Sequence, residues 1–128
     1  IDSLPTVKWW MKNGDSGRDW YSIRYFNTVT NKTELFYPDW ILKLKDGTVC
    51  IFDTKAGITA TQTETKCKAE ELQKKLRYLN GFNREFIRYI GGITRKENGI
   101  WYLNNSTEYS CTLGSTEGWI ELSKVLNI

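Results

Sequence analysis

Two aspartates and one lysine have residue types and a spacing that could do chemistry together. Asp53 lies 14 residues after Asp39 and is separated from Lys55 by a single threonine. The chain contains no histidine, which excludes Ser-His-Asp and Cys-His catalysis and a zinc site of the usual Cys/His kind. Any chemistry therefore has to use carboxylates, lysines and a hard metal ion.

The position of the first aspartate relative to the other two residues depends on a turn. Successive side chains of a strand alternate between faces, so Asp53 and Lys55 project from the same face. The dipeptide Asp46-Gly47 is a hairpin signal. A two-residue loop there sets Asp39 opposite Thr54, whereas a three-residue loop sets it opposite Asp53.

The apolar pattern favours the three-residue loop, formed by residues 45–47. In that register Trp40 faces Phe52, and one face of the hairpin is continuously apolar. The alternative register would place Trp40 opposite Asp53, because a slip of one residue moves every side chain to the other face. We therefore expect Asp39 and Asp53 to face each other across the hairpin.

Two facing aspartates repel each other, and one of them would stay protonated without compensation. A divalent cation such as Mg²⁺ removes the conflict, lowers the pKa of a bound water and stabilises charge on a phosphate. Lys55 could then orient the attacking water or offset charge in the transition state. Taken separately, Pro-Asp is common in turns and Asp-x-Lys is common on solvated faces. Their combination on two paired strands favours phosphodiester hydrolysis, and a turn aspartate beside a solvated strand face stays open as the alternative.

The elements that must position these residues follow from apolar periodicity. A helix is expected from about Thr61 to the stop signal Asn80-Gly81, with a possible capping box at its start. Its lysines alternate with glutamates, so they either contact a DNA backbone or form an ordinary charged surface. A short helix is expected at 119–126. Strands are expected at 7–11, 21–26, 35–45, 48–55, 86–94, 99–103 and 109–113. The pattern predicts an α/β or α+β domain around a mixed sheet.

Composition limits the remaining possibilities. A length of 128 residues with 40% apolar residues predicts one domain, 1–128, with its own core. The net charge of +3 permits a nucleic-acid partner without demanding one. Three scattered cysteines favour a reducing cytoplasm. No apolar run suits a membrane span, and the start at Ile1 suggests a fragment of a longer protein with no signal peptide.

Several short segments resemble a known family. Pro38-Asp39 followed by Asp53-Thr54-Lys55 looks like the PD-(D/E)xK nuclease signature. The surrounding sequence resembles the endonuclease domain of type III restriction enzymes. In that family this domain is the C-terminal part of the restriction subunit and follows a superfamily 2 helicase motor. The similarity covers roughly the first 80 residues. The segments that carry it are VKWW at 7–10, KNGD at 12–15, FYPDW at 36–40 and DTKAG at 53–57.

The resemblance implies a restriction-endonuclease-like fold, with a mixed central β-sheet flanked by helices, and Mg²⁺-dependent cleavage of double-stranded DNA. Mn²⁺ would substitute for Mg²⁺. Asp39 and Asp53 would bind the metal with the Thr54 carbonyl as a third ligand, and Lys55 would be the catalytic lysine. ATP would act only through the upstream helicase motor of the parent protein, whose partner would be a modification methyltransferase subunit.

One departure from the superfamily pattern leaves an alternative function open. Many members bind the metal with an additional Glu, on a helix ahead of the sheet, and no such helix is expected before Trp9. Asp15 is a speculative substitute, although a plain turn aspartate is the simpler interpretation. Gln73, on the helix after Lys55, is a further residue that could face the site. The alternative is a catalytically weak or inactive DNA-binding or docking module that retains the nuclease fold.

Overall fold

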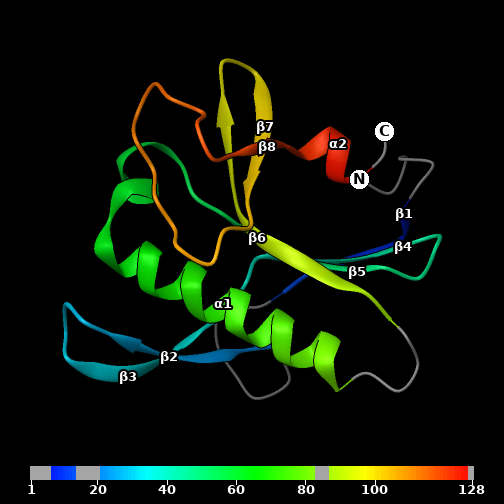
Figure 1. Ribbon diagram of the computed structural model, residues 1–128, viewed down its shortest axis with the longest axis horizontal. Helices are drawn as coiled ribbons and strands as arrows, with labels where there is room; N and C mark the ends of the chain where they lie inside the picture. The colour runs from blue at the N-terminus through cyan, green and yellow to red at the C-terminus, as the bar shows by residue number, and fades with distance from the viewer. Residues whose placement is uncertain (1–6, 14–20, 83–86, 127–128) are drawn as a thin grey trace.

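The computed structural model describes residues 7–13, 21–82 and 87–126. A six-stranded sheet has the order β1-β4-β5-β6-β7-β8, and β2 and β3 form a separate two-stranded sheet (Figure 1). The strands are β1 (Val7–Lys12), β2 (Ile23–Asn27), β3 (Lys32–Phe36), β4 (Trp40–Leu44), β5 (Val49–Thr54), β6 (Tyr89–Glu97), β7 (Ile100–Asn104) and β8 (Ile120–Glu121). The helices are the 3₁₀-helix η1 (Gly57–Thr61), α1 (Thr63–Gly81) and α2 (Leu122–Leu126).

The central sheet is mixed. Strands β5 and β6 pair in parallel, and the chain between them forms η1 and α1. The other neighbouring strands of this sheet pair antiparallel. A parallel pair needs a long crossover, which a helix usually supplies. The structure is therefore the mixed α/β arrangement that the sequence predicted.

Helix α1 crosses one face of the sheet and also packs against the β2–β3 hairpin (Figure 1). The predicted apolar face is confirmed, since Ala69, Leu72 and Leu76 are buried. Leu72 and Leu76 share a core cluster with Ile51 of β5 and Ile23 of β2. The odd-numbered side chains of β5 therefore point toward α1, and this face also carries Asp53.

The opposite face of the sheet has its own apolar cluster. Leu42, Phe52 and Leu103 come from neighbouring strands, and Leu126 of α2 packs against them. The even-numbered side chains of β4 and β5 supply this second core. Burial on both faces explains why Cys50, Ile51 and Phe52 are all buried in the middle of β5.

The predicted three-residue hairpin loop is confirmed. The N–H of Leu44 donates to the carbonyl of Thr48 at 2.8 Å, and the N–H of Gly47 donates to the carbonyl of Leu44 at 3.0 Å. Gly47 has a φ of 94°, in the region that glycine adopts without a steric penalty. Trp40 pairs with Phe52, so the register that places Asp39 near Asp53 is the one formed.

The predicted continuous strand at 35–45 is wrong. The chain forms β3 up to Phe36 and β4 from Trp40, and these strands belong to different sheets. Pro38 lies between them and has no N–H to donate to a ladder. The apolar pattern runs through both strands, so periodicity alone could not separate them.

Two predictions near the end of the chain are also wrong. Residues 109–113 form no strand, because Tyr109 uses its backbone differently: its N–H donates to Glu70 at 2.9 Å and its carbonyl accepts from Lys66 at 3.2 Å. The predicted helix at 119–126 begins only at Leu122. Ile120 and Glu121 pair with β7 instead.

The start of α1 does not use the predicted capping box. Gln62 is the N-cap residue and makes no side-chain capping bond. The hydroxyl of Thr61 donates to the carbonyl of Ile58 at 2.6 Å, within η1.

No helix within the described ranges is long and apolar enough to cross a bilayer.

Candidate active site

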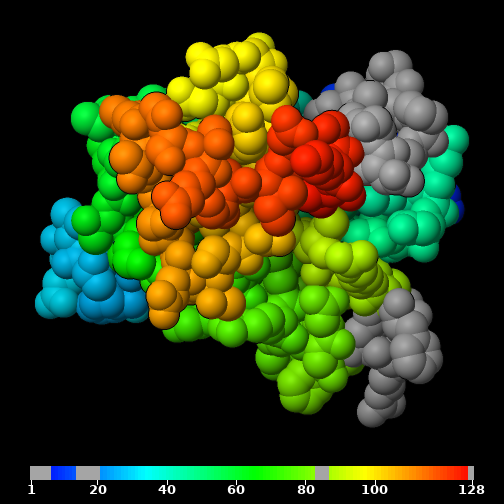
Figure 2. Space-filling view, turned by 45° about the horizontal axis from the view of Figure 1, so that its top comes forward, coloured from blue at the N-terminus to red at the C-terminus, as the bar shows by residue number. Residues whose placement is uncertain are grey.

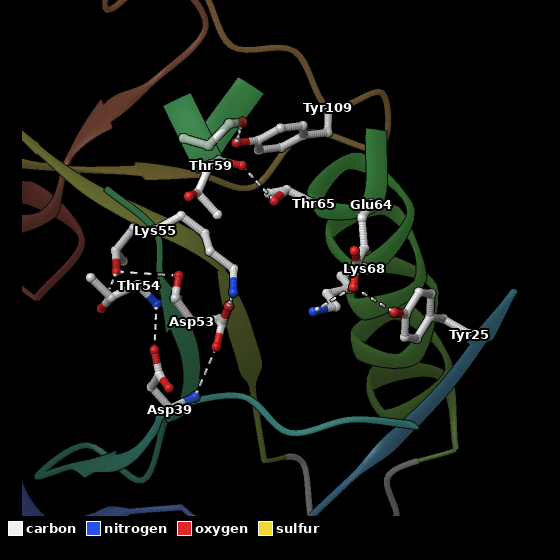
Figure 3. Close-up of polar contacts among 12 residues, drawn as sticks. Tyr25, Asp39, Asp53, Thr54, Lys55, Thr59, Glu64, Thr65, Lys68 and Tyr109 are labelled. Carbon is white, nitrogen blue, oxygen red and sulfur yellow. Dashed lines mark hydrogen bonds and ion pairs between the residues drawn. The ribbon is translucent and has the colours of Figure 1, made fainter. Parts of the chain in front are cut away.

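The two aspartates lie together where the β4–β5 hairpin opens (Figure 3). The N–H of Asp39 donates to Oδ1 of Asp53 at 3.2 Å. Oδ2 of Asp39 accepts from the N–H of Thr54 at 3.0 Å. Each carboxylate thus binds the backbone of the opposite chain segment, which fixes both side chains at the same end of the sheet.

The lysine of the predicted trio reaches the same place. Lys55 follows the last residue of β5, and its Nζ lies 3.1 Å from Oδ2 of Asp53. Figure 3 shows its side chain folding back toward that carboxylate. Asp39, Asp53 and Lys55 are therefore brought together, as the sequence predicted.

The carboxylate of Asp53 is under electrostatic stress. The residue is only 2% exposed, and burial raises the pKa of its carboxyl from 3.8 to about 6; Lys55 lowers this pKa and Asp39 raises it. Oδ2 accepts no well-aligned hydrogen bond from the described residues, and the Lys55 ammonium is its ion-pair partner. A buried charge with incomplete compensation is costly and is a feature of functional sites.

Strand β6 supports the end of β5 that carries Asp53. The carbonyl of Thr94 accepts the N–H of Lys55 at 2.9 Å. The hydroxyls of Thr54 and Thr94 lie 3.0 Å apart, and Thr94 also donates to the carbonyl of Asp53 at 3.5 Å. Sequence reasoning missed Thr94, because its pairing with β5 depends on a parallel crossover that no local pattern encodes.

Asn13 supports the other aspartate. Its N–H donates to the carbonyl of Asp39 at 2.7 Å. Its side-chain amide donates to the carbonyl of Tyr21 at 2.6 Å and accepts the N–H of Tyr21 at 3.0 Å. In the sequence Asn13 stood out only as part of the segment KNGD at 12–15, yet it ties the end of β1 to the segment that carries Asp39.

The segment after Lys55 is held by a later part of the chain. The hydroxyl of Tyr109 donates to the carbonyl of Ala60 at 2.6 Å, and Thr65 donates to the carbonyl of Thr59 at 2.7 Å (Figure 3). The space-filling view shows residues of the β7–β8 connection, in orange, lying against the green start of α1 (Figure 2). These contacts give the turn after Lys55 a fixed path.

Other residues singled out in the sequence do not join the site. Gln73 is buried, and its side-chain amide donates to the carbonyl of Gly91 at 2.9 Å, so it supports β6. Asp15 lies outside the described residues. Ion pairs with neighbouring glutamates engage Lys66, Lys68 and Lys74 of α1, which favours the interpretation of an ordinary charged surface.

The residues present fit a hard divalent cation. Mg²⁺ prefers carboxylate oxygens and retains several waters, and this site offers two adjacent carboxylates. The buried Oδ2 of Asp53 accepts no well-aligned hydrogen bond from the described residues beside its ion pair with Lys55, so it keeps lone pairs that a metal ion could use. The N–H of Thr54 donates to Asp39, and the carbonyl of Thr54 is the third ligand that the family resemblance implies.

No protein-family model, curated protein or solved structure matches this chain.

Proposed function

We propose that this chain is the divalent-metal-dependent endonuclease domain of a type III restriction enzyme, with a restriction-endonuclease-like fold. Its reaction is the hydrolysis of phosphodiester bonds in double-stranded DNA. The observation that carries the proposal is the buried carboxylate of Asp53, placed beside Asp39 and within 3.1 Å of the Lys55 ammonium. The likeness of the segments around these residues to that family supports the choice of substrate.

The protein's own groups have separate tasks in this proposal. Asp39 and Asp53, with the Thr54 carbonyl, hold the cation, and their backbone hydrogen bonds keep both carboxylates at the same sheet edge. A bound Mg²⁺ supplies a water of lowered pKa and charge stabilisation at the phosphate. Lys55 orients the attacking water and offsets negative charge that develops in the transition state. Its ion pair with Asp53 keeps the ammonium beside the carboxylates before substrate arrives.

The remaining functions belong to other parts of the parent enzyme. ATP use is assigned to an upstream helicase motor, and recognition of the DNA site to a modification methyltransferase subunit. This division predicts that the chain by itself cleaves without sequence preference. It also predicts that ATP does not alter the cleavage rate of the isolated chain.

The proposal is tested by nicking of a supercoiled plasmid with Mg²⁺ or Mn²⁺. Wild-type protein should nick the plasmid only when the metal is present, and Asp53→Asn should abolish nicking. Asp46→Asn is a matched control, because Asp46 lies in the loop at the opposite end of the same hairpin. Metal binding without nicking would favour the inactive docking module, and equal nicking by both variants would exclude this site as the catalytic one.

A further inference from the structure

A groove of about 580 Å³ lies on the sheet face opposite α1. Side chains from β4, β5 and β7 line it, together with α2. Its volume is within the range of pockets that hold small molecules or single ligand groups. Most of its lining is apolar, and it includes Trp40, Phe52, Ile100, Trp101 and Leu122.

The groove and the candidate active site lie on opposite faces of the sheet but include residues adjacent in the chain. Trp40 lines the groove and follows Asp39 directly in the chain, and Thr54 lines it between Asp53 and Lys55. Because side chains alternate along a strand, the candidate catalytic residues and the groove residues project from opposite faces at the same end of β4 and β5. A nucleic-acid strand that passes over this end of the two strands can therefore contact both sets of residues.

Aromatic rings are accessible in this part of the sheet face. Trp101 is 40% exposed and Trp10 is 36% exposed. The rings of Trp10 and Trp40 have their centroids 5.2 Å apart. Exposed tryptophans on a sheet are suited to stacking with planar groups, and every nucleobase has such a face.

Lysines accompany the tryptophans at this edge. Lys12 pairs with Trp40 across β1 and β4, and Lys96 pairs with Trp101 across β6 and β7. Side chains of directly paired residues lie on the same face and close together. Both lysines are exposed, so each is an exposed cationic neighbour of a tryptophan that lines the groove.

We propose that this groove binds unpaired nucleotides of the DNA strand next to the phosphodiester that is cleaved. Bases stack on Trp40 and Trp101, and Lys12 and Lys96 contact the phosphates. A duplex presents phosphates outward and hides its base faces, so it cannot fill an apolar groove. The exposed ammonium groups match a polyanion. The inference rests on the proposed nuclease function and adds that the substrate is locally unpaired.

The test is a fluorescence anisotropy titration without metal, using a labelled oligothymidylate of roughly ten nucleotides, within the site sizes of single-strand grooves. The same measurement on a duplex of equal length gives the reference. Trp101→Ala should weaken single-strand binding about tenfold, with a smaller effect on the duplex. Lys96→Gln should weaken it as well and reduce the slope of log affinity against log salt by about 0.7.

Two control variants lie on the separate β2–β3 sheet. Phe26→Ala removes an aromatic ring that is 51% exposed, and Lys32→Gln removes an exposed lysine; neither should alter binding. Unfolding curves of all four variants show whether a loss of binding reflects a loss of structure.

Either of two results overturns the inference: the wild type does not prefer the single strand, or Trp101→Ala and Lys96→Gln leave its affinity unchanged. The second result is expected if the groove takes an apolar protein segment instead. These outcomes are independent of cleavage. Nicking without single-strand preference would contradict only this inference, and single-strand binding without nicking would contradict only the proposed catalysis.

Discussion

The substitution Asp53→Asn should stabilise the protein in the absence of metal while removing its activity. The carboxyl of Asp53 has a pKa of about 6, against 3.8 for an unperturbed group, chiefly because it is buried. Asparagine has no charge to bury, and its side-chain oxygen can still accept the N–H of Asp39. The buried charge of Asp53 would then lower the stability of the fold while serving the activity.

The size and sign of the effect follow from the two pKa values. The folded protein binds the proton more tightly than the unfolded chain, so the wild type loses stability as pH rises from about 4 to about 6. A difference of one unit between the two pKa values corresponds to about 1.4 kcal/mol. The ionised Asp53 therefore lowers the free energy of unfolding by about 3 kcal/mol above pH 7. Because the asparagine amide also faces the Lys55 ammonium, we expect a gain of about 1–3 kcal/mol.

The assay is urea unfolding of both proteins in a chelator at pH values from 4 to 8. The difference in unfolding free energy should be near zero at pH 4 and reach its maximum above pH 7. Asp46→Asn should behave oppositely, because hydrogen bonds from Thr48 lower the pKa of that carboxyl and its ionised form favours the fold. If Asp53→Asn is less stable than the wild type at pH 8, burial of the ionised Asp53 does not destabilise the fold.

Three further substitutions test the site and its support. Lys55→Met should raise the pKa of Asp53 above about 6, because the ion pair with Lys55 lowers it. NMR titration of the Asp53 carboxyl carbon measures this pKa, and an unchanged value would contradict the prediction. Gln73→Leu should reduce the free energy of unfolding by about 1–3 kcal/mol, since the carbonyl of Gly91 loses its buried donor; calorimetric melting measures it, and an unchanged Tm would count against it. Gly91→Ala should reduce the free energy of unfolding more than Gln73→Leu does, because a Cβ at residue 91 meets the backbone carbonyl of Ile51. Urea unfolding measures it, and wild-type stability of this variant would contradict the close approach.

The sequence predicted the parts of the site that depend on local patterns. The register of the β4–β5 hairpin followed from the match of Trp40 with Phe52, and this match brings Asp39 beside Asp53. The helical period of Ala69 and Leu72 located α1. These features are encoded within short stretches of chain, where alternation and turn chemistry apply directly.

The parts that escaped prediction depend on contacts between distant segments. Thr94 supports Lys55 only because β6 lies parallel to β5, and Asn13 supports Asp39 only because β1 pairs with β4. Tyrosine is common in strands, but the hydroxyl of Tyr109 donates to the carbonyl of Ala60 and its backbone N–H donates to Glu70 of α1. Tertiary contacts outweighed local β preference there.

We propose that Asp39 and Asp53 together hold a divalent cation. The decisive measurement is calorimetric titration of Mn²⁺ into the wild type, Asp39→Ala and Asp53→Ala at pH 8, with Asp46→Ala as the control. We predict binding to the wild type and the control, no binding to either site variant, and weaker wild-type binding at pH 5, where protons compete for Asp53. Absence of binding to the wild type, or equal binding to all four proteins, would contradict the claim.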